Sequence, residues 1–83
     1  MDVTADVLRL LDEVLSLNGR AALFTRATHL LGAIPELDSM AVVNLIAGIE
    51  DHFGIVVDDD EIDGATFATV GTLIDFVAEK IAA

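Results

Sequence analysis

The stretch Ser-Met-Ala-Val-Val-Asn-Leu-Ile-Ala-Gly-Ile-Glu-Asp-His-Phe-Gly, residues 39–54, has the most regular hydrophobic pattern in the chain. Its large apolar side chains recur at the three- and four-residue spacing that places side chains on one face of an α-helix. They are Val42, Leu45, Ile46, Ile49 and Phe53. Gly54 follows, and glycine readily takes the left-handed conformation at which many helices end. The stretch therefore predicts a helix over residues 39–53 that ends at Gly54.

Residues 3–17 repeat this pattern on the N-terminal side. Apolar residues again fall at helical spacing, and charged residues lie mostly between them. Asp2 or Thr4 is expected to cap the start of this helix. The Asn18-Gly19 pair predicts its end, because both residues tolerate the left-handed backbone conformation.

Residues 70–81 form a third amphipathic segment, with Thr69 as the expected N-cap. Ile55–Val57 has the composition of a strand, but no other segment offers it a partner strand. We therefore expect an extended loop there. One short helix is expected within residues 58–69.

Residues 18–38 form a long connection without a sustained hydrophobic period. Phe24, Leu30, Leu31 and Ile34 are expected to bury and so to hold the connection against the core. A length of 83 residues suits one domain, predicted to span residues 1–83. The predicted fold is all-α, a small four-helix bundle of three main helices and one short one.

The charge balance excludes some classes of partner. Fifteen acidic and four basic residues give a net charge of −11, which opposes binding to a phosphate backbone. The chain opens with acids where a secretory signal would have basic residues, and its longest near-apolar run, residues 40–49, is too short to span a bilayer. We therefore expect a cytoplasmic monomer with no nucleic-acid partner and no membrane insertion.

The sequence offers little for catalysis or metal binding. His29 and His52 are isolated, there is no cysteine, and no serine has a histidine and an acid in a familiar arrangement. Residues 59–64 match the first positions of a calcium-binding loop, but its twelfth position is Val70 rather than glutamate. We expect a protein that is not an enzyme and an acidic segment that is a solvated edge.

Ser39 is the remaining candidate, at the start of the most regular helix. It could be an ordinary N-cap, since serine is a common capping residue. However, Val42 stands where a capping-box partner would be, and Met40 and Val43 are apolar where a plain surface helix would be polar. A helix start is also a favourable place for a phosphate group, because free N–H groups lie there.

Three segments in this order resemble the acyl carrier protein family. They are Leu37-Asp38-Ser39-Met40, Ile49-Glu50-Asp51-His52-Phe53-Gly54-Ile55 and Phe67-Ala68-Thr69-Val70-Gly71-Thr72-Leu73-Ile74-Asp75-Phe76-Val77. The resemblance implies a four-helix bundle whose Ser39 carries 4′-phosphopantetheine, transferred from coenzyme A by a separate phosphopantetheinyl transferase. It implies that Asp38 is read by this transferase. The thiol of the arm would carry acyl groups as thioesters, in lipid biosynthesis or fatty acid metabolism.

The chain departs from the common pattern of the family after the serine. Fatty-acid carriers usually present several acids there, whereas this chain has Ala41 and Asn44. We expect partner enzymes, acyl ligases or synthases, to bind an outward stripe by apolar contact, with acids at its far end steering the approach. These predicted partner-binding residues are Met40, Val43, Ala47, Glu50 and Asp51. The segment from Asp58 to Glu61 is expected to add to the steering.

The loop before the serine, residues 31–38, is longer than in housekeeping carriers and is similar to that of stand-alone carriers in specialised pathways. Two alternatives remain open: a peptidyl-type carrier of amino acids, and an acidic interaction module in which Ser39 is only a cap. Gly48 also has two interpretations, close helix packing or a groove for an acyl chain, of which we favour packing.

Overall fold

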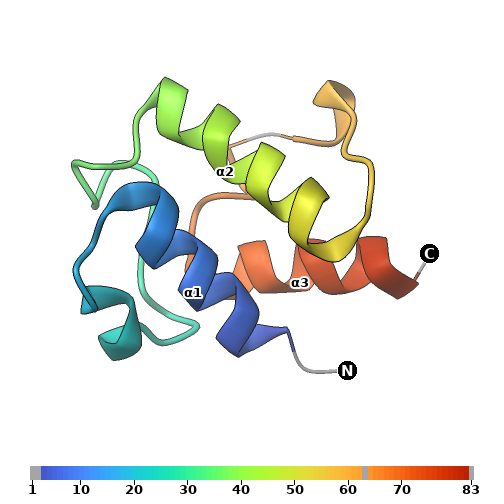
Figure 1. Ribbon diagram of the computed structural model, residues 1–83. Helices are drawn as coiled ribbons and strands as arrows, with labels where there is room; N and C mark the ends of the chain where they lie inside the picture. Colours follow the sequence, from blue (N-terminus) through green and yellow to red (C-terminus); the bar gives the residue numbers. More distant parts are fainter. Residues whose placement is uncertain (1–2, 63, 83) are drawn as a thin grey trace.

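The computed structural model describes residues 3–62 and 64–82 (Figure 1). It contains three α-helices in these residues. They are α1 (Thr4–Leu15), α2 (Ser39–Phe53) and α3 (Val70–Ala82). Two single 3-10 turns join them, η1 (Arg20–Leu23) and η2 (Asp59–Glu61). α1 and α2 pack side by side and run in nearly opposite directions, and α3 also contacts α1. The predicted all-α fold is confirmed, and the short fourth helix is the turn η2.

α2 has the predicted bounds. Gly54 follows it with φ of 67°, and its N–H bonds the Glu50 carbonyl, as expected for a left-handed helix end. The predicted cap of α3 is also confirmed, because the Thr69 hydroxyl accepts the Thr72 N–H and the Thr72 hydroxyl accepts the Thr69 N–H. Local sequence signals therefore determined both of these helices.

α1 differs from its prediction at both ends. Val3 precedes it without any side-chain cap, so a capping role for Thr4, the first helical residue, is wrong. Asp2 lies outside the described residues. At the other end the chain leaves the helix at Ser16, whose φ is 54°, and this turn buries Leu17 to 1% exposure. The hydrophobic burial of Leu17 thus ends the helix before the Asn18-Gly19 pair is reached.

Asp12 explains why the chain after α1 turns into η1. One carboxylate oxygen accepts the Gly19 N–H at 3.1 Å, and the other accepts the Ala21 N–H at 3.3 Å. The side chain therefore satisfies two backbone donors at the start of a turn, where they have no partner in the turn itself. The amphipathic pattern of residues 3–17 had identified Asp12 only as part of a polar face.

Asp12→Ala should lower the free energy of unfolding by about 1 kcal/mol, because the two N–H groups lose their acceptor. Urea denaturation followed by circular dichroism measures the change. Glu13→Ala, one residue further along the same helix and exposed, is the control, with an expected change within about 0.5 kcal/mol. Equal losses in the two variants would show that the Asp12 bonds do not stabilise η1.

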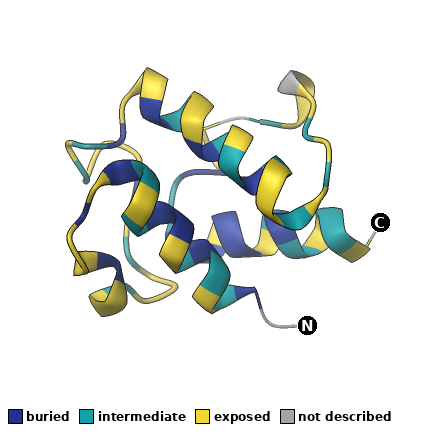
Figure 2. Ribbon diagram, in the orientation of Figure 1, coloured by how far each residue is buried: buried dark blue, intermediate teal, exposed yellow. Residues whose placement is uncertain are grey.

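The core draws on all three helices and on the connection between α1 and α2 (Figure 2). Leu11, Leu45 and Leu73 are fully buried, one from each helix, and Leu30 of the connection joins them. The connection is therefore held against the core as predicted, although Leu31 is an exception. It is 48% exposed, because its neighbour Leu30 already takes the inward position.

A short backbone ladder fixes the same connection to the start of α3. The N–H groups of Leu30 and Leu31 bond the carbonyls of Ala68 and Phe67, each at 3.0 Å. In the other direction, Val70 and Gly71 donate to Thr28 and Arg26, each at 2.9 Å. The beginning of α3 and the middle of the long connection thus form one unit.

Residues 55–58 form neither helix nor strand, in agreement with the loop predicted for residues 55–57, and run to the turn η2. Glu61 of this turn pairs with Lys80 of α3 at 2.8 Å, and the hydrogen bond from Lys80 lowers the pKa of the Glu61 carboxyl.

Gly48 lies against α1, where an added Cβ would stand 3.7 Å from Leu10 and from Val14. This contact supports the packing interpretation of Gly48.

Candidate functional site

Ser39 is the first residue of α2, and its side chain is exposed. The N-cap of this helix is Asp38, whose backbone is extended and whose carboxylate accepts the Ala41 N–H at 2.8 Å. The interpretation of Ser39 as an ordinary N-cap is therefore wrong. Asp38 and Ser39 are both good capping residues, and the extended conformation at Asp38 decides between them. The cap leaves the Ser39 hydroxyl at the surface.

The loop that leads to Ser39 is held at several points. Leu37 is 5% exposed and donates its N–H to the Ile34 carbonyl at 3.0 Å. Glu36 forms an ion pair with Arg20 of η1, and the hydrogen bond from Arg20 lowers the pKa of the Glu36 carboxyl. The backbone before Ser39 is thus anchored to the core and to η1, so the serine is presented from a fixed position.

A depression of about 650 Å³ adjoins Ser39. The loop forms one wall and the first turn of α2 forms the other. The lining residues are mainly apolar: Leu31, Gly32, Leu37, Asp38, Ser39 and Val42. This depression was not predicted from the sequence, because Leu31 was expected to be buried.

The outward stripe of α2 is present as expected. Met40 is 69% exposed and Val43 is 60% exposed, and Ala47 is exposed as well. The outer side of α2 carries a run of exposed residues in Figure 2. Asp51 is exposed, whereas Glu50 is half-buried and accepts the Val57 N–H at 2.9 Å. The acids at the far end of the stripe thus differ in how freely they face solvent.

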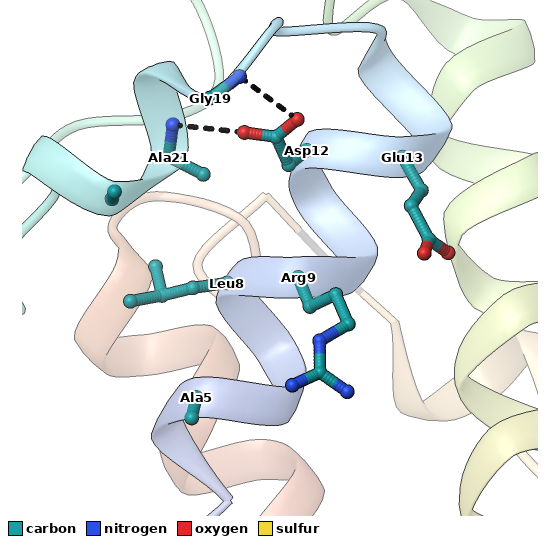
Figure 3. Close-up of a pocket in the computed structure, with 8 residues that line it drawn as sticks. Ala5, Leu8, Arg9, Asp12, Glu13, Gly19 and Ala21 are labelled. Atoms are coloured by element: carbon teal, nitrogen blue, oxygen red, sulfur yellow. Dashed lines mark hydrogen bonds between the residues drawn. The ribbon is translucent and has the colours of Figure 1, made fainter.

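A second depression lies between α1 and η1 (Figure 3). In the close-up the Asp12 carboxylate points to Gly19 and Ala21, with Leu8 and Arg9 nearby. Ser39 and the predicted partner-binding residues do not line this depression. It is therefore separate from the site at the start of α2.

The histidines and the acidic segment form no metal site in the part of the chain that the structure describes. His52 lies 3.8 Å from Asp6 and packs edge-on against Phe53, and the backbone of His29 pairs with that of Thr69. Asp63 of the calcium-like pattern lies outside the described residues. Across residues 3–62 and 64–82, the helices are also too short or too polar to cross a membrane.

Comparison with known proteins gives one consistent result. The family described as "phosphopantetheine attachment site" matches residues 36–77, half of the chain. The acyl carrier protein AsbD of Bacillus anthracis is 42% identical over 43 residues, which are 52% of this chain and 47% of that protein. The match thus spans only about half the length of this curated relative. The solution NMR structure of a holo acyl carrier protein from Nitrosomonas europaea is 47% identical over 100% of both chains, with a TM-score of 0.92.

The fold and the site are those of a small helical carrier domain, in which a surface serine opens a helix. The chain belongs to the acyl carrier protein family and has a phosphopantetheine attachment site. It is a carrier protein, as the sequence predicted. The family match favours a carrier over the interaction module without a prosthetic group.

The residues at the start of α2 fit a phosphopantetheine group. The Ser39 hydroxyl is exposed, and the N–H groups of the first helical turn favour a phosphate beside it. The depression next to Ser39 leaves space along the adjoining loop. When bound, the group supplies a terminal thiol that carries cargo as a thioester.

Proposed function

We propose that Ser39 carries the 4′-phosphopantetheine arm and that this protein presents acyl thioesters on it to partner enzymes. The observation that carries the assignment is the division of roles at the start of α2. Asp38 caps the helix, and Ser39 is exposed within the segment that matches the attachment-site family. The hydroxyl is therefore free for modification without loss of the cap.

In this reaction the Ser39 oxygen attacks the phosphorus of coenzyme A that bears the pantetheine. A P–O bond of the pyrophosphate breaks, and 3′,5′-ADP leaves. The serine proton passes to a base of the transferase, so the carrier itself needs no base beside Ser39. The chain's own contribution is to hold the hydroxyl at the surface on a fixed loop.

The test is to incubate the purified protein with coenzyme A and a broad-specificity phosphopantetheinyl transferase. Intact mass should increase by one phosphopantetheinyl group, and peptide mapping should locate it at Ser39. An unchanged mass, or a group located on another residue, would disprove the assignment.

The transferase is proposed to recognise the Asp38 carboxylate as well as the Ser39 hydroxyl. Asp38→Asn keeps a side-chain oxygen for the Ala41 N–H but removes the charge, whereas Asp38→Ala removes both. If the transferase recognises the negative charge of Asp38, both variants should be modified at least tenfold more slowly in a time course followed by mass spectrometry. Thermal denaturation should show that only Asp38→Ala loses stability, by about 1 kcal/mol. A normal rate for Asp38→Asn would mean that Asp38 acts only as the cap.

Partner enzymes, acyl ligases or synthases of lipid or fatty acid metabolism, are proposed to dock on Met40, Val43 and Ala47. The exposure of Met40 and Val43 supports this surface. Glu50 and Asp51 lie at the C-terminal end of this stripe. Together with the acids of residues 58–61 they would attract a basic partner and guide its approach. Of these acids we expect Asp51 to contribute more than Glu50, whose carboxylate is engaged with the Val57 N–H.

The whole chain, residues 1–83, is proposed to act as one carrier domain. We infer that it works as a monomer in the cytoplasm, where coenzyme A is available to supply the arm. The long loop before Ser39 and the sparse acids after it favour a specialised pathway over housekeeping fatty-acid synthesis. Loading assays with acyl and aminoacyl ligases, followed by mass spectrometry, distinguish acyl from aminoacyl cargo.

A further inference from the structure

We propose that the depression beside Ser39 is a resting site for the part of the arm closest to the protein. Leu31 and Val42 would contact the two methyl groups of its pantoyl unit. This inference rests on the assignment of the arm to Ser39. It concerns where the arm lies between encounters with partner enzymes.

The position of the depression is the first reason. Ser39 is itself one of the lining residues, so a group bonded to its oxygen begins at the edge of the site. The covalent tether gives the arm a high effective concentration there, and weak contacts are then enough to hold it.

The chemistry of the walls is the second reason. Beyond the phosphate, the first group of the arm is a carbon with two methyl substituents, which is apolar. Leu31 is a large apolar residue that is 48% exposed, and Val42 is half-buried on the facing turn of α2. Contact with these methyl groups would remove the apolar surface of both residues from water.

Gly32, which lines the depression, adds no side chain to the loop wall. Its φ is 85°, a conformation that suits glycine, and an added Cβ would meet no heavy atom within 4 Å. The backbone of Gly32 therefore borders open space next to Leu31. A chain-like group can lie along it without displacing a side chain.

The walls are fixed before the arm arrives. The Leu31 N–H bonds the Phe67 carbonyl at 3.0 Å, and the Ala33 and Ile34 N–H groups bond the Leu30 carbonyl at 3.1 and 3.0 Å. The other wall is held by the Asp38 cap. A preformed site costs the protein little conformational entropy on binding.

The resting site and the partner-binding surface are different stripes of α2. Ser39 lies between the two stripes, because Val42, three residues on, lies to one side of it and Val43, four residues on, lies to the other. Met40 and Ala47 continue the Val43 side. An arm held against Leu31 and Val42 would leave Met40 and Val43 open to a partner.

The experiment compares the unmodified and modified forms of isotope-labelled protein by NMR. Intact mass first establishes that one arm is bound at Ser39. In the modified protein, nuclear Overhauser effects should connect the pantoyl methyl groups with the methyl groups of Leu31 and Val42. The amide signals of residues 31 and 32 should also shift on modification.

Leu31→Ser, once intact mass shows that it is fully modified, should lose the Overhauser effects to Val42 and the shift at Gly32. Leu23→Ser is the matched control, because Leu23 is 83% exposed on η1 and does not line the depression. It should behave as the wild type. Complete modification without contacts to Leu31 and Val42 would disprove the resting site alone. Failure of modification would disprove the assignment to Ser39 and the resting site together.

Discussion

Ser39→Ala should abolish the transfer of phosphopantetheine completely and leave the free energy of unfolding within about 0.5 kcal/mol of the wild type. Both parts follow from the start of α2. The Ser39 hydroxyl is the proposed nucleophile, whereas the helix is capped by Asp38. Alanine at an exposed first-turn position has high helix propensity, so the fold has no reason to weaken.

Two measurements check this result: intact mass after incubation with coenzyme A and transferase, and urea denaturation of the unmodified protein. Thr25→Ala, which removes another exposed hydroxyl, is the control and should be modified at the wild-type rate. A loss of about 1 kcal/mol in Ser39→Ala would be the result for an N-cap serine and would contradict the geometry at Asp38. A mass gain in Ser39→Ala would contradict the proposed attachment.

The parts of the fold that were predictable are those with a local signal. α2 has both a clean hydrophobic stripe and a terminal glycine, and its bounds agree with the prediction. α1 has the stripe, but the burial of Leu17 ends it early, and burial depends on the rest of the core. A helix end that is set by tertiary packing is not visible in a single amphipathic pattern.

The backbone ladder between the connection and α3 could not have been predicted. Its bonds join residues such as Leu31 and Phe67 that are far apart in sequence, and backbone groups leave no pattern in the amino-acid types. Within this ladder Leu30 takes the inward position and Leu31 is left exposed, which is why the depression beside Ser39 was missed. The one local hint was Gly32, next to Leu31, which suits a sharp change of direction.

The site at the start of α2 was predictable in its residues but not in their roles. Asp38 and Ser39 are adjacent, and either could cap the helix by residue type. Only the extended backbone at Asp38 assigns the cap and so leaves Ser39 exposed. The exposure of Met40 and Val43 was predicted correctly, because the stripe of buried residues on α2 fixes which positions face outward.

Gly71→Ala should lower the free energy of unfolding by about 2–3 kcal/mol, the largest effect on stability expected here for so small a change. An added Cβ would stand 2.9 Å from the carbonyl oxygen of Arg26. That same oxygen accepts the Gly71 N–H at 2.9 Å, so the two backbones cannot separate without breaking the ladder. The clash is with backbone and not with a flexible side chain, and no rotamer change relieves it.

Gly48→Ala is the matched control, since it makes the same substitution inside another helix. Its Cβ would lie 3.7 Å from Leu10 and Val14, an ordinary contact, so the gain in helix propensity should stabilise the protein by about 0.5–1 kcal/mol. Thermal denaturation should therefore shift in opposite directions for the two variants. Equal shifts would contradict the close approach of Gly71 to Arg26.

Leu31 is held by the same backbone ladder as Gly71. A substitution at Gly71 that weakens the ladder should therefore also affect the depression beside Ser39. The Gly71→Ala variant should be modified with the arm and studied at a low temperature at which it remains folded. The contacts of the arm with Leu31 should then be weaker than in the wild type, although Gly71 does not line the depression. In Gly48→Ala these contacts should persist, since Gly48 packs against α1. The pair of variants thus separates two effects of glycine in one fold. At Gly71 the missing side chain lets two backbones approach each other, and at Gly48 it only costs helix stability.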